Sequence, residues 1–227
     1  MHAVTTEGVS RRYGRRWALI DVTLDVPRGS VAVVAGRNGS GKSTLLRVLA
    51  TAIRPNLGRA AIEGFDVVEA RDDARHAVAL LGHASYLYDS LTARENLVIV
   101  ARFLGRSTSD VVDALREVGL EPRADDVVST FSAGMRKRLS FARVLLQRPR
   151  VVLLDEPYGQ LDPPGFAMVD DFVTRFRRDG ATVVMATHQL ARGASLGDIA
   201  FTLAEGRLQW QGSAAELVRQ EGSTAES

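Results

Sequence analysis

The sequence has 227 residues, of which 45% are hydrophobic, 6% aromatic and 25% charged. This composition suits one folded domain, or one domain with a subdomain, and excludes a globally disordered chain. The formal net charge of +2 gives no indication of a nucleic-acid-binding surface, and the absence of cysteine excludes disulfides and cysteine-ligated metal sites.

The first twelve residues are polar and lack the apolar core of a signal peptide. No window approaches about 18 consecutive apolar residues, so we expect no membrane span. The sequence therefore predicts a cytoplasmic protein that reaches the inner face of the membrane only through a partner.

The first half of the chain carries two strand patterns and a helix pattern. Val22, Leu24 and Val26 alternate with polar residues, as in a half-buried strand. The apolar run 31–35 predicts a strand that is buried on both faces. A glycine-rich loop follows it, and then a helix over about residues 42–53, which Pro55 and Gly58 end.

From about residue 85 to 147 the pattern is helical. Thr92 and Glu95 have the spacing of a capping box, and Ser109–Asp110 predicts the start of another helix. Apolar runs over 151–154 and 183–186 then predict two more buried strands. Buried strands that alternate with helices indicate an α/β fold with a mostly parallel sheet and an inserted helical subdomain.

A phosphate-binding pattern, G-x-x-x-x-G-K-[ST], lies between the first buried strand and its helix. Glycines let the backbone N–H groups wrap a phosphate chain, and the helix N-terminus adds its positive dipole end. Lys42 supplies a charge near the β- and γ-phosphates, and Ser43 offers a hydroxyl to Mg²⁺. We expect ATP to contact Gly36, Asn38, Gly39, Ser40, Gly41, Lys42, Ser43 and Thr44.

Two carboxylates follow the second buried strand, at the edge of the sheet where ligands bind. Asp155 is placed to hold Mg²⁺ through water, and Glu156 is placed to act as a general base on the attacking water. Without the phosphate loop, a solvated turn would be the commoner interpretation.

These motifs resemble those of ABC ATPases over almost the whole chain. Residues 131–135, Phe-Ser-Ala-Gly-Met, resemble the family signature Leu-Ser-Gly-Gly-Gln at Ser132 and Gly134. The resemblance implies a homodimer in which this element contacts the γ-phosphate held by the other subunit. Leu161-Asp162 resembles the end of the D-loop, although Tyr158-Gly159-Gln160 is an unusual approach to it.

Three further residues take their roles from the resemblance. His188 matches the switch histidine that touches the γ-phosphate, and Tyr13 matches the aromatic residue that stacks on adenine. His83 stands where most members have the glutamine that links Mg²⁺ and water to the membrane partner. His83 either replaces that glutamine or packs against Tyr86 or Tyr88.

The resemblance implies a P-loop NTPase core with an N-terminal antiparallel β subdomain and an ABC-type helical subdomain at about 85–148. The nucleotide-binding domain would span 1–217, followed by a flexible polar tail at 218–227. The chain would be a Mg-dependent ATPase that drives a separate membrane permease, which docks near 83–89.

Gly82-His83, the 91–96 segment and Thr187-His-Gln-Leu190 resemble the ATPase of the haem exporter of cytochrome c maturation. Haem export is therefore the expected role. The alternative is another ABC exporter, of drugs, lipids or polysaccharide. Three other classes are disfavoured. A soluble ABC ATPase of chromosomes would carry a long coiled coil between the phosphate loop and the signature, and a translation factor would carry two cassettes, whereas this sequence shows neither. A non-ABC P-loop kinase would leave Ser132 and His188 unexplained.

Overall fold

The computed structural model describes residues 1–82 and 86–224. The chain divides into two units, which are described separately here. The first comprises Met1–Gly82, Arg150–Pro157 and Asp170–Ser227, and the second comprises His83–Pro149 and Tyr158–Val169.

The first unit contains a six-stranded sheet with the order β10-β9-β3-β8-β7-β6. Strands β9, β3, β8, β7 and β6 pair parallel to one another in this order, and β10 pairs antiparallel with β9. Every residue of β3, β7 and β8 is buried, as the continuous apolar runs predicted. The strands are β3 (Val31–Ala35), β6 (Val78–Leu81), β7 (Val151–Asp155), β8 (Thr182–Ala186), β9 (Ile199–Ala204) and β10 (Arg207–Ser213).

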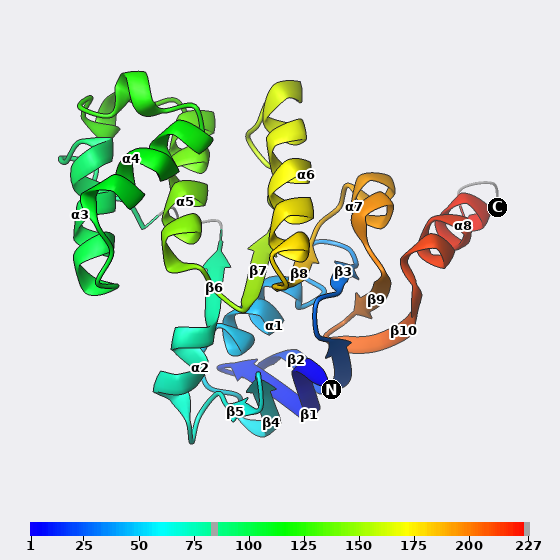
Figure 1. The fold of residues 1–227 in the computed structure, drawn as a ribbon. Helices are drawn as coiled ribbons and strands as arrows, with labels where there is room; N and C mark the ends of the chain where they lie inside the picture. Colours follow the sequence, from blue (N-terminus) through cyan, green and yellow to red (C-terminus); the bar gives the residue numbers. More distant parts are fainter. Residues whose placement is uncertain (83–85, 225–227) are drawn as a thin grey trace. The chain divides into compact units, whose positions relative to one another are not determined.

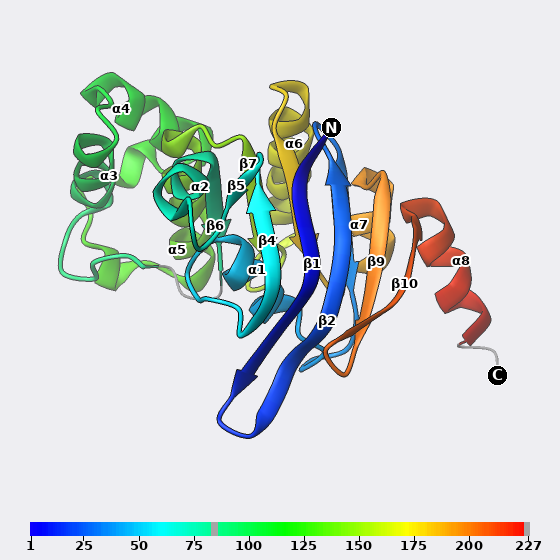
Figure 2. The same cartoon turned by 90° about the horizontal axis from the view of Figure 1, so that it is seen from below.

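A four-stranded antiparallel sheet with the order β2-β1-β4-β5 forms the rest of the β structure of this unit. Its strands are β1 (His2–Tyr13), β2 (Arg16–Pro27), β4 (Leu57–Ile62) and β5 (Phe65–Asp66). Figure 2 shows that β1 and β2 form a long hairpin. The hairpin turns at Gly14, so Tyr13 lies opposite Arg16. The alternation at Val22, Leu24 and Val26 is the buried face of β2.

Helix α1 (Lys42–Leu49) contacts strands of both sheets (Figure 1). Its Leu45, Leu46 and Leu49 are completely buried. The helix is shorter than the expected 42–53 because the chain turns at Thr51, which has a φ of 58°. The other helices with residues in this unit are α2 (Arg71–Ala77), the C-terminal part of α6 (Pro163–Arg178), α7 (Leu190–Leu196) and α8 (Ala214–Thr224).

Helix α8 differs from the expected polar tail, since residues 218–224 are helical. Ala214 and Leu217 are buried, and Glu216 accepts hydrogen bonds from the backbone and hydroxyl of Ser213 at 2.9 Å each, which supports the first turn. None of the helices in the described ranges is long and apolar enough to cross a membrane.

The second unit is helical, with α3 (Ala93–Phe103), α4 (Thr108–Glu117), α5 (Ala133–Gln147) and two short 3₁₀ helices, Glu121–Arg123 and Val128–Thr130. The predicted capping box of Thr92 and Glu95 is confirmed at the start of α3. Helix α4 starts earlier than Ser109, because Ser107 caps it in a second capping box with Asp110.

Candidate functional site

The phosphate loop connects β3 to α1 and has room only for glycine at two places. Gly36 has a φ of 139°, and a Cβ there would lie 2.2 Å from the Leu203 carbonyl oxygen. Gly41 has a φ of 111°, and a Cβ there would lie 2.6 Å from the Ala18 carbonyl oxygen. The loop therefore presses its backbone against neighbouring strands and leads directly into the helix N-terminus.

Two polar side chains of this loop are buried. The Lys42 ammonium donates to the carbonyl oxygens of Gly36, at 2.6 Å, and Arg37, at 3.3 Å. Ser40 is 5% exposed, and its hydroxyl has no hydrogen-bond partner among the described residues. A buried cation and an unpartnered hydroxyl fit a loop that encloses an anionic ligand.

Ser43 and Asp155 meet although they are 112 positions apart in the sequence. The Ser43 hydroxyl donates to the Asp155 carboxylate over 3.0 Å. Asp155 ends β7 and is 4% exposed. A hydroxyl and a carboxylate are the hard oxygen donors that Mg²⁺ prefers, so this pair fits the expected metal site. Thr44 lies beside Ser43 in the first turn of α1.

Glu156 and His188 extend from the ends of the neighbouring strands β7 and β8. The Glu156 carboxylate lies 2.7 Å from the His188 Nδ1 and accepts from the His188 backbone N–H at 3.3 Å. Glu156 has a φ of 48°, and its own N–H donates to the Ala186 carbonyl. The Glu156 side chain is 13% exposed and that of His188 is 61% exposed, so the pair lies at the sheet edge with the histidine toward solvent.

A pocket of about 910 Å³ lies beside the phosphate loop, and residues 36–40 and His188 line it. Arg16 and Trp17 of the β1–β2 hairpin also line it, whereas Tyr13 is not among its lining residues. The Arg12 guanidinium lies 5.7 Å from the Trp17 ring centroid. Sequence reasoning missed Arg16 and Trp17. The available signal was the turn at Gly14, which brings the second strand of the hairpin back along the loop.

The signature residues lie at the start of α5, in the second unit. Ser132 is the N-cap, and its hydroxyl accepts from the Met135 backbone N–H at 3.2 Å. Gly134 lies in the first turn of this 15-residue helix. Ser132 and Gly134 are thus at the positive end of a helix dipole.

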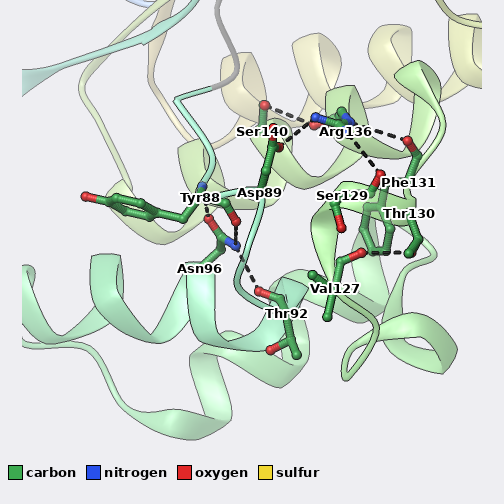
Figure 3. A network of polar contacts seen from close by, with 10 residues as sticks. All are labelled: Tyr88, Asp89, Thr92, Asn96, Val127, Ser129, Thr130, Phe131, Arg136 and Ser140. Carbon is green, nitrogen blue, oxygen red and sulfur yellow. Dashed lines mark hydrogen bonds and ion pairs between the residues drawn. The ribbon is translucent and has the colours of Figure 1, made fainter.

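Arg136 forms hydrogen bonds to the segment that precedes the N-terminus of α5. Its guanidinium donates to the Asp89 carboxylate at 2.6 Å and to the carbonyls of Ser129 and Phe131 at 3.2 and 3.3 Å. Figure 3 shows Arg136 between Asp89 and the 129–131 segment, with the Tyr88 ring directed away from this network. Phe131, which replaces the leucine of the signature, is 5% exposed. The network braces the backbone that precedes Ser132.

The loop over residues 158–162 follows the acidic pair in the chain. Tyr158 is buried, and its ring packs edge-on against Phe166 with the centroids 5.7 Å apart. Asp162 accepts from the Gly165 backbone N–H at 3.0 Å and lies 3.8 Å from Arg138. His83, which was expected either to replace the family glutamine or to pack against Tyr86 or Tyr88, lies outside the described residues.

The family model described as "ABC transporter" matches residues 19–159. The chain is 38% identical to the daunorubicin resistance ATP-binding protein DrrA3 of Streptomyces coeruleorubidus, over 97% of this chain and 71% of that protein. It is 31% identical to the lantibiotic transport ATP-binding protein SrtF of Streptococcus pyogenes, over 89% of this chain and 87% of that protein.

A solved structure titled "Structure of ATP binding subunit of ABC transporter" superposes with a TM-score of 0.87 at 28% identity, covering 97% of this chain and 93% of that chain. The predicted P-loop core with its antiparallel sheet and helical insertion is thereby confirmed. These relatives give no support to haem export, which rested on short stretches of sequence. The chain belongs to the ABC transporter family as an ATP-binding subunit with an ATP-hydrolysing domain.

Proposed function

We propose that this chain is the Mg-dependent ATPase subunit of an exporter for drug-like or peptide antibiotics. The observation that carries the proposal is the convergence, at one edge of the six-stranded sheet, of the phosphate loop, the Ser43–Asp155 pair and the Glu156–His188 pair. The 38% identity to a daunorubicin resistance ATPase favours this cargo class over haem.

The residues of the first unit then have the following roles. The phosphate loop binds the phosphates of ATP through its backbone N–H groups, and Lys42 exchanges its contacts with loop carbonyls for contacts with phosphate oxygens. Ser43 and Asp155 hold Mg²⁺, which neutralises phosphate charge when bound. The resemblance assigns the adenine to Tyr13, whereas the lining of the pocket favours Trp17.

Glu156 acts as the general base for the attacking water, and His188 contacts the γ-phosphate. The contact between Glu156 and His188 supports this division of roles, because it keeps both side chains at the same strand ends as the phosphate loop. Release of the carboxylate from the imidazole is the step that frees it to accept a proton from water.

A second copy of the chain completes each site. Ser132 and Gly134, at the N-terminus of α5, supply a hydroxyl and backbone N–H groups that suit the γ-phosphate bound by the other copy. The membrane permease docks on the helical unit near Tyr86 and Tyr88, whose side chains are 65% and 59% exposed. Because the permease holds it, the chain works at the inner face of the cell membrane.

The test of the cargo class is a deletion strain. Loss of resistance to an anthracycline or a lantibiotic, restored by the wild-type gene but not by Glu156→Gln, supports the proposal. Unchanged resistance together with lost c-type cytochromes would favour the haem branch. Co-purification with a permease, reduced by a charge placed at Leu87 or Tyr88, tests the docking surface.

A further inference from the structure

The end of the β1–β2 hairpin has a surface rich in arginine, which we call the arginine patch. Neither residues 10–20, which include the end of the hairpin, nor residues 43–62 contain an aspartate or a glutamate. Strand β4 pairs with β1 only as far as Ser10, so the hairpin extends past the end of β4 (Figure 2). The patch consists of Arg11, Arg12, Arg15, Arg16 and Arg54.

Two hydrogen bonds tie the segment that contains Arg54 to the hairpin. The Arg11 guanidinium donates to the Arg54 carbonyl oxygen at 3.1 Å. The Arg12 backbone N–H donates to the Asn56 side-chain oxygen at 2.9 Å. Arg54 therefore lies beside the arginines of the hairpin, and the positive charges gather at one end of the antiparallel sheet.

The arginine patch keeps its positive charge. The guanidiniums of Arg11 and Arg12 lie 5.0 and 5.7 Å from the ring centroids of Tyr13 and Trp17, and such contacts do not neutralise a cation. Within residues 1–82 and 86–224, no carboxylate forms an ion pair with an arginine of the patch. Because like charges that lie close together repel one another, this surface favours a bound anion from outside the chain.

Exposed apolar side chains border the arginine patch. Tyr13 is 46% exposed and is not among the residues that line the ATP pocket, and Leu57 is 60% exposed. Arginine beside exposed aromatic and aliphatic side chains is typical of segments that bind at the membrane–water interface. A nucleic acid would pair with the guanidiniums through its phosphates, but its backbone would offer Leu57 no apolar contact.

We propose that the arginine patch binds the anionic headgroups of a phospholipid bilayer. The guanidiniums pair with lipid phosphates, whose geometry suits their forked N–H donors, and Tyr13 and Leu57 contact the interfacial layer. Each arginine near an anionic surface strengthens binding about fivefold. This inference goes beyond the proposed function, in which the permease alone holds the chain at the membrane.

The test measures co-sedimentation of the full chain with vesicles of phosphatidylcholine, with or without phosphatidylglycerol. The wild type should bind the anionic vesicles at low ionic strength and dissociate near 1 M salt, where the Debye length is about 3 Å. Arg15→Glu/Arg54→Glu should lower the partition coefficient about thirtyfold or more, because two attractive charges become repulsive. Arg15→Lys/Arg54→Lys keeps both charges and should retain most of the binding.

Arg75→Glu/Arg219→Glu is the matched control. It changes the net charge by the same amount at exposed side chains of α2 and α8, and it should bind the vesicles as the wild type does. Arg15 and Arg54 do not line the ATP pocket, so the patch variant should bind a fluorescent ATP analogue with unchanged affinity. Unchanged analogue binding also shows that the patch variant is folded.

Three outcomes would overturn the proposal. The first is equal vesicle binding by the patch variant and the control. The second is a loss of analogue binding together with vesicle binding, which would place these arginines at the nucleotide. The third is a wild type that binds a DNA duplex but no anionic vesicles, which would make nucleic acid the partner. Because the vesicles contain no permease, none of these outcomes depends on the cargo or on permease docking.

Discussion

The phosphate-loop region of the first unit and the signature region of the second differ in how their polar groups are satisfied. In the first, Lys42 bonds loop carbonyls, Ser43 bonds Asp155, and Glu156 bonds His188. In the second, Ser132 caps its own helix and Gln160 is exposed in a strained turn. In the first region, side chains that are distant in the sequence bond one another, whereas in the second Ser132 bonds within its own helix turn and Gln160 is exposed. This difference fits the proposed division of roles. The first region carries out ATP hydrolysis, and the second region completes the ATP site of a second copy.

The strongest way to break this comparison is to remove the general base. Glu156→Gln should lower the rate of ATP hydrolysis at least about a hundredfold, because general-base catalysis typically contributes 10²–10⁴-fold. Phosphate release measured at saturating ATP gives the rate, and ATP binding should persist. Glu69→Gln, a change on an exposed side chain elsewhere in this unit, is the control and should hydrolyse ATP normally. Turnover near the wild-type value in Glu156→Gln would remove Glu156 from the role.

The next effect concerns binding rather than chemistry. Lys42→Ala should weaken ATP binding by roughly 10- to 100-fold, because hydrogen bonds to charged groups contribute about 1.5–3 kcal/mol each. Calorimetry of the monomer measures this directly. The buried Lys42 ammonium also bridges two loop carbonyls, so thermal unfolding without nucleotide must be compared. Unchanged ATP affinity would contradict the phosphate-loop assignment.

A smaller loss of ATP affinity should show which aromatic residue at the edge of the first region contacts adenine. Trp17 lines the pocket and Tyr13 does not, so Trp17→Ala should weaken ATP binding about two- to tenfold, and Tyr13→Ala should weaken it less. The sequence contains two tryptophans. Trp210→Phe therefore leaves Trp17 as the single reporter, whose fluorescence should change on ATP addition. A larger loss of ATP affinity in Tyr13→Ala than in Trp17→Ala would show that adenine stacks on Tyr13.

The local part of the first region could be predicted from the sequence. The strand Val31–Ala35 was predicted with its exact bounds, because a continuous apolar run has few other structures available to it. The loop glycines follow from a motif whose spacing encodes its geometry, and Ser43 and Asp155 had both been assigned to Mg²⁺ before the structure showed their contact. The capping box at Thr92 was recognised for the same reason.

Features that depend on distant contacts could not be predicted in this way. The lining of the pocket by Trp17 depends on where the β1–β2 hairpin lies against the loop. The strain at Gln160 depends on the anchors at Tyr158 and Asp162, although the order Gly-Gln in the turn was visible as unusual. The haem-exporter interpretation failed for a related reason, since it rested on a few short stretches while the 38% identity extends over 97% of the chain.

The smallest expected effect is a change in melting temperature, which tests whether the N-terminal capping box of α4 stabilises the second unit. The Ser107 hydroxyl accepts from the Asp110 backbone N–H. The hydroxyl and the backbone N–H of Ser107 both donate to the Asp110 carboxylate, and these two donated bonds hold the pKa of Asp110 below its usual value. Ser107→Ala should lower the melting temperature by a few degrees, and Ser107→Thr, which keeps a capping hydroxyl, should largely restore it.

The pH dependence of this difference has a definite sign. A carboxyl with a depressed pKa in the folded state adds stability above its unfolded pKa, near 3.8, and loses it as the pH falls through the lower folded value. The gap in melting temperature between wild type and Ser107→Ala should therefore be constant from about pH 7 to 5 and narrow only in stronger acid. A gap that stays constant into stronger acid would show that the cap acts without the Asp110 carboxylate, and a gap of zero at neutral pH would show that packing alone orders α4.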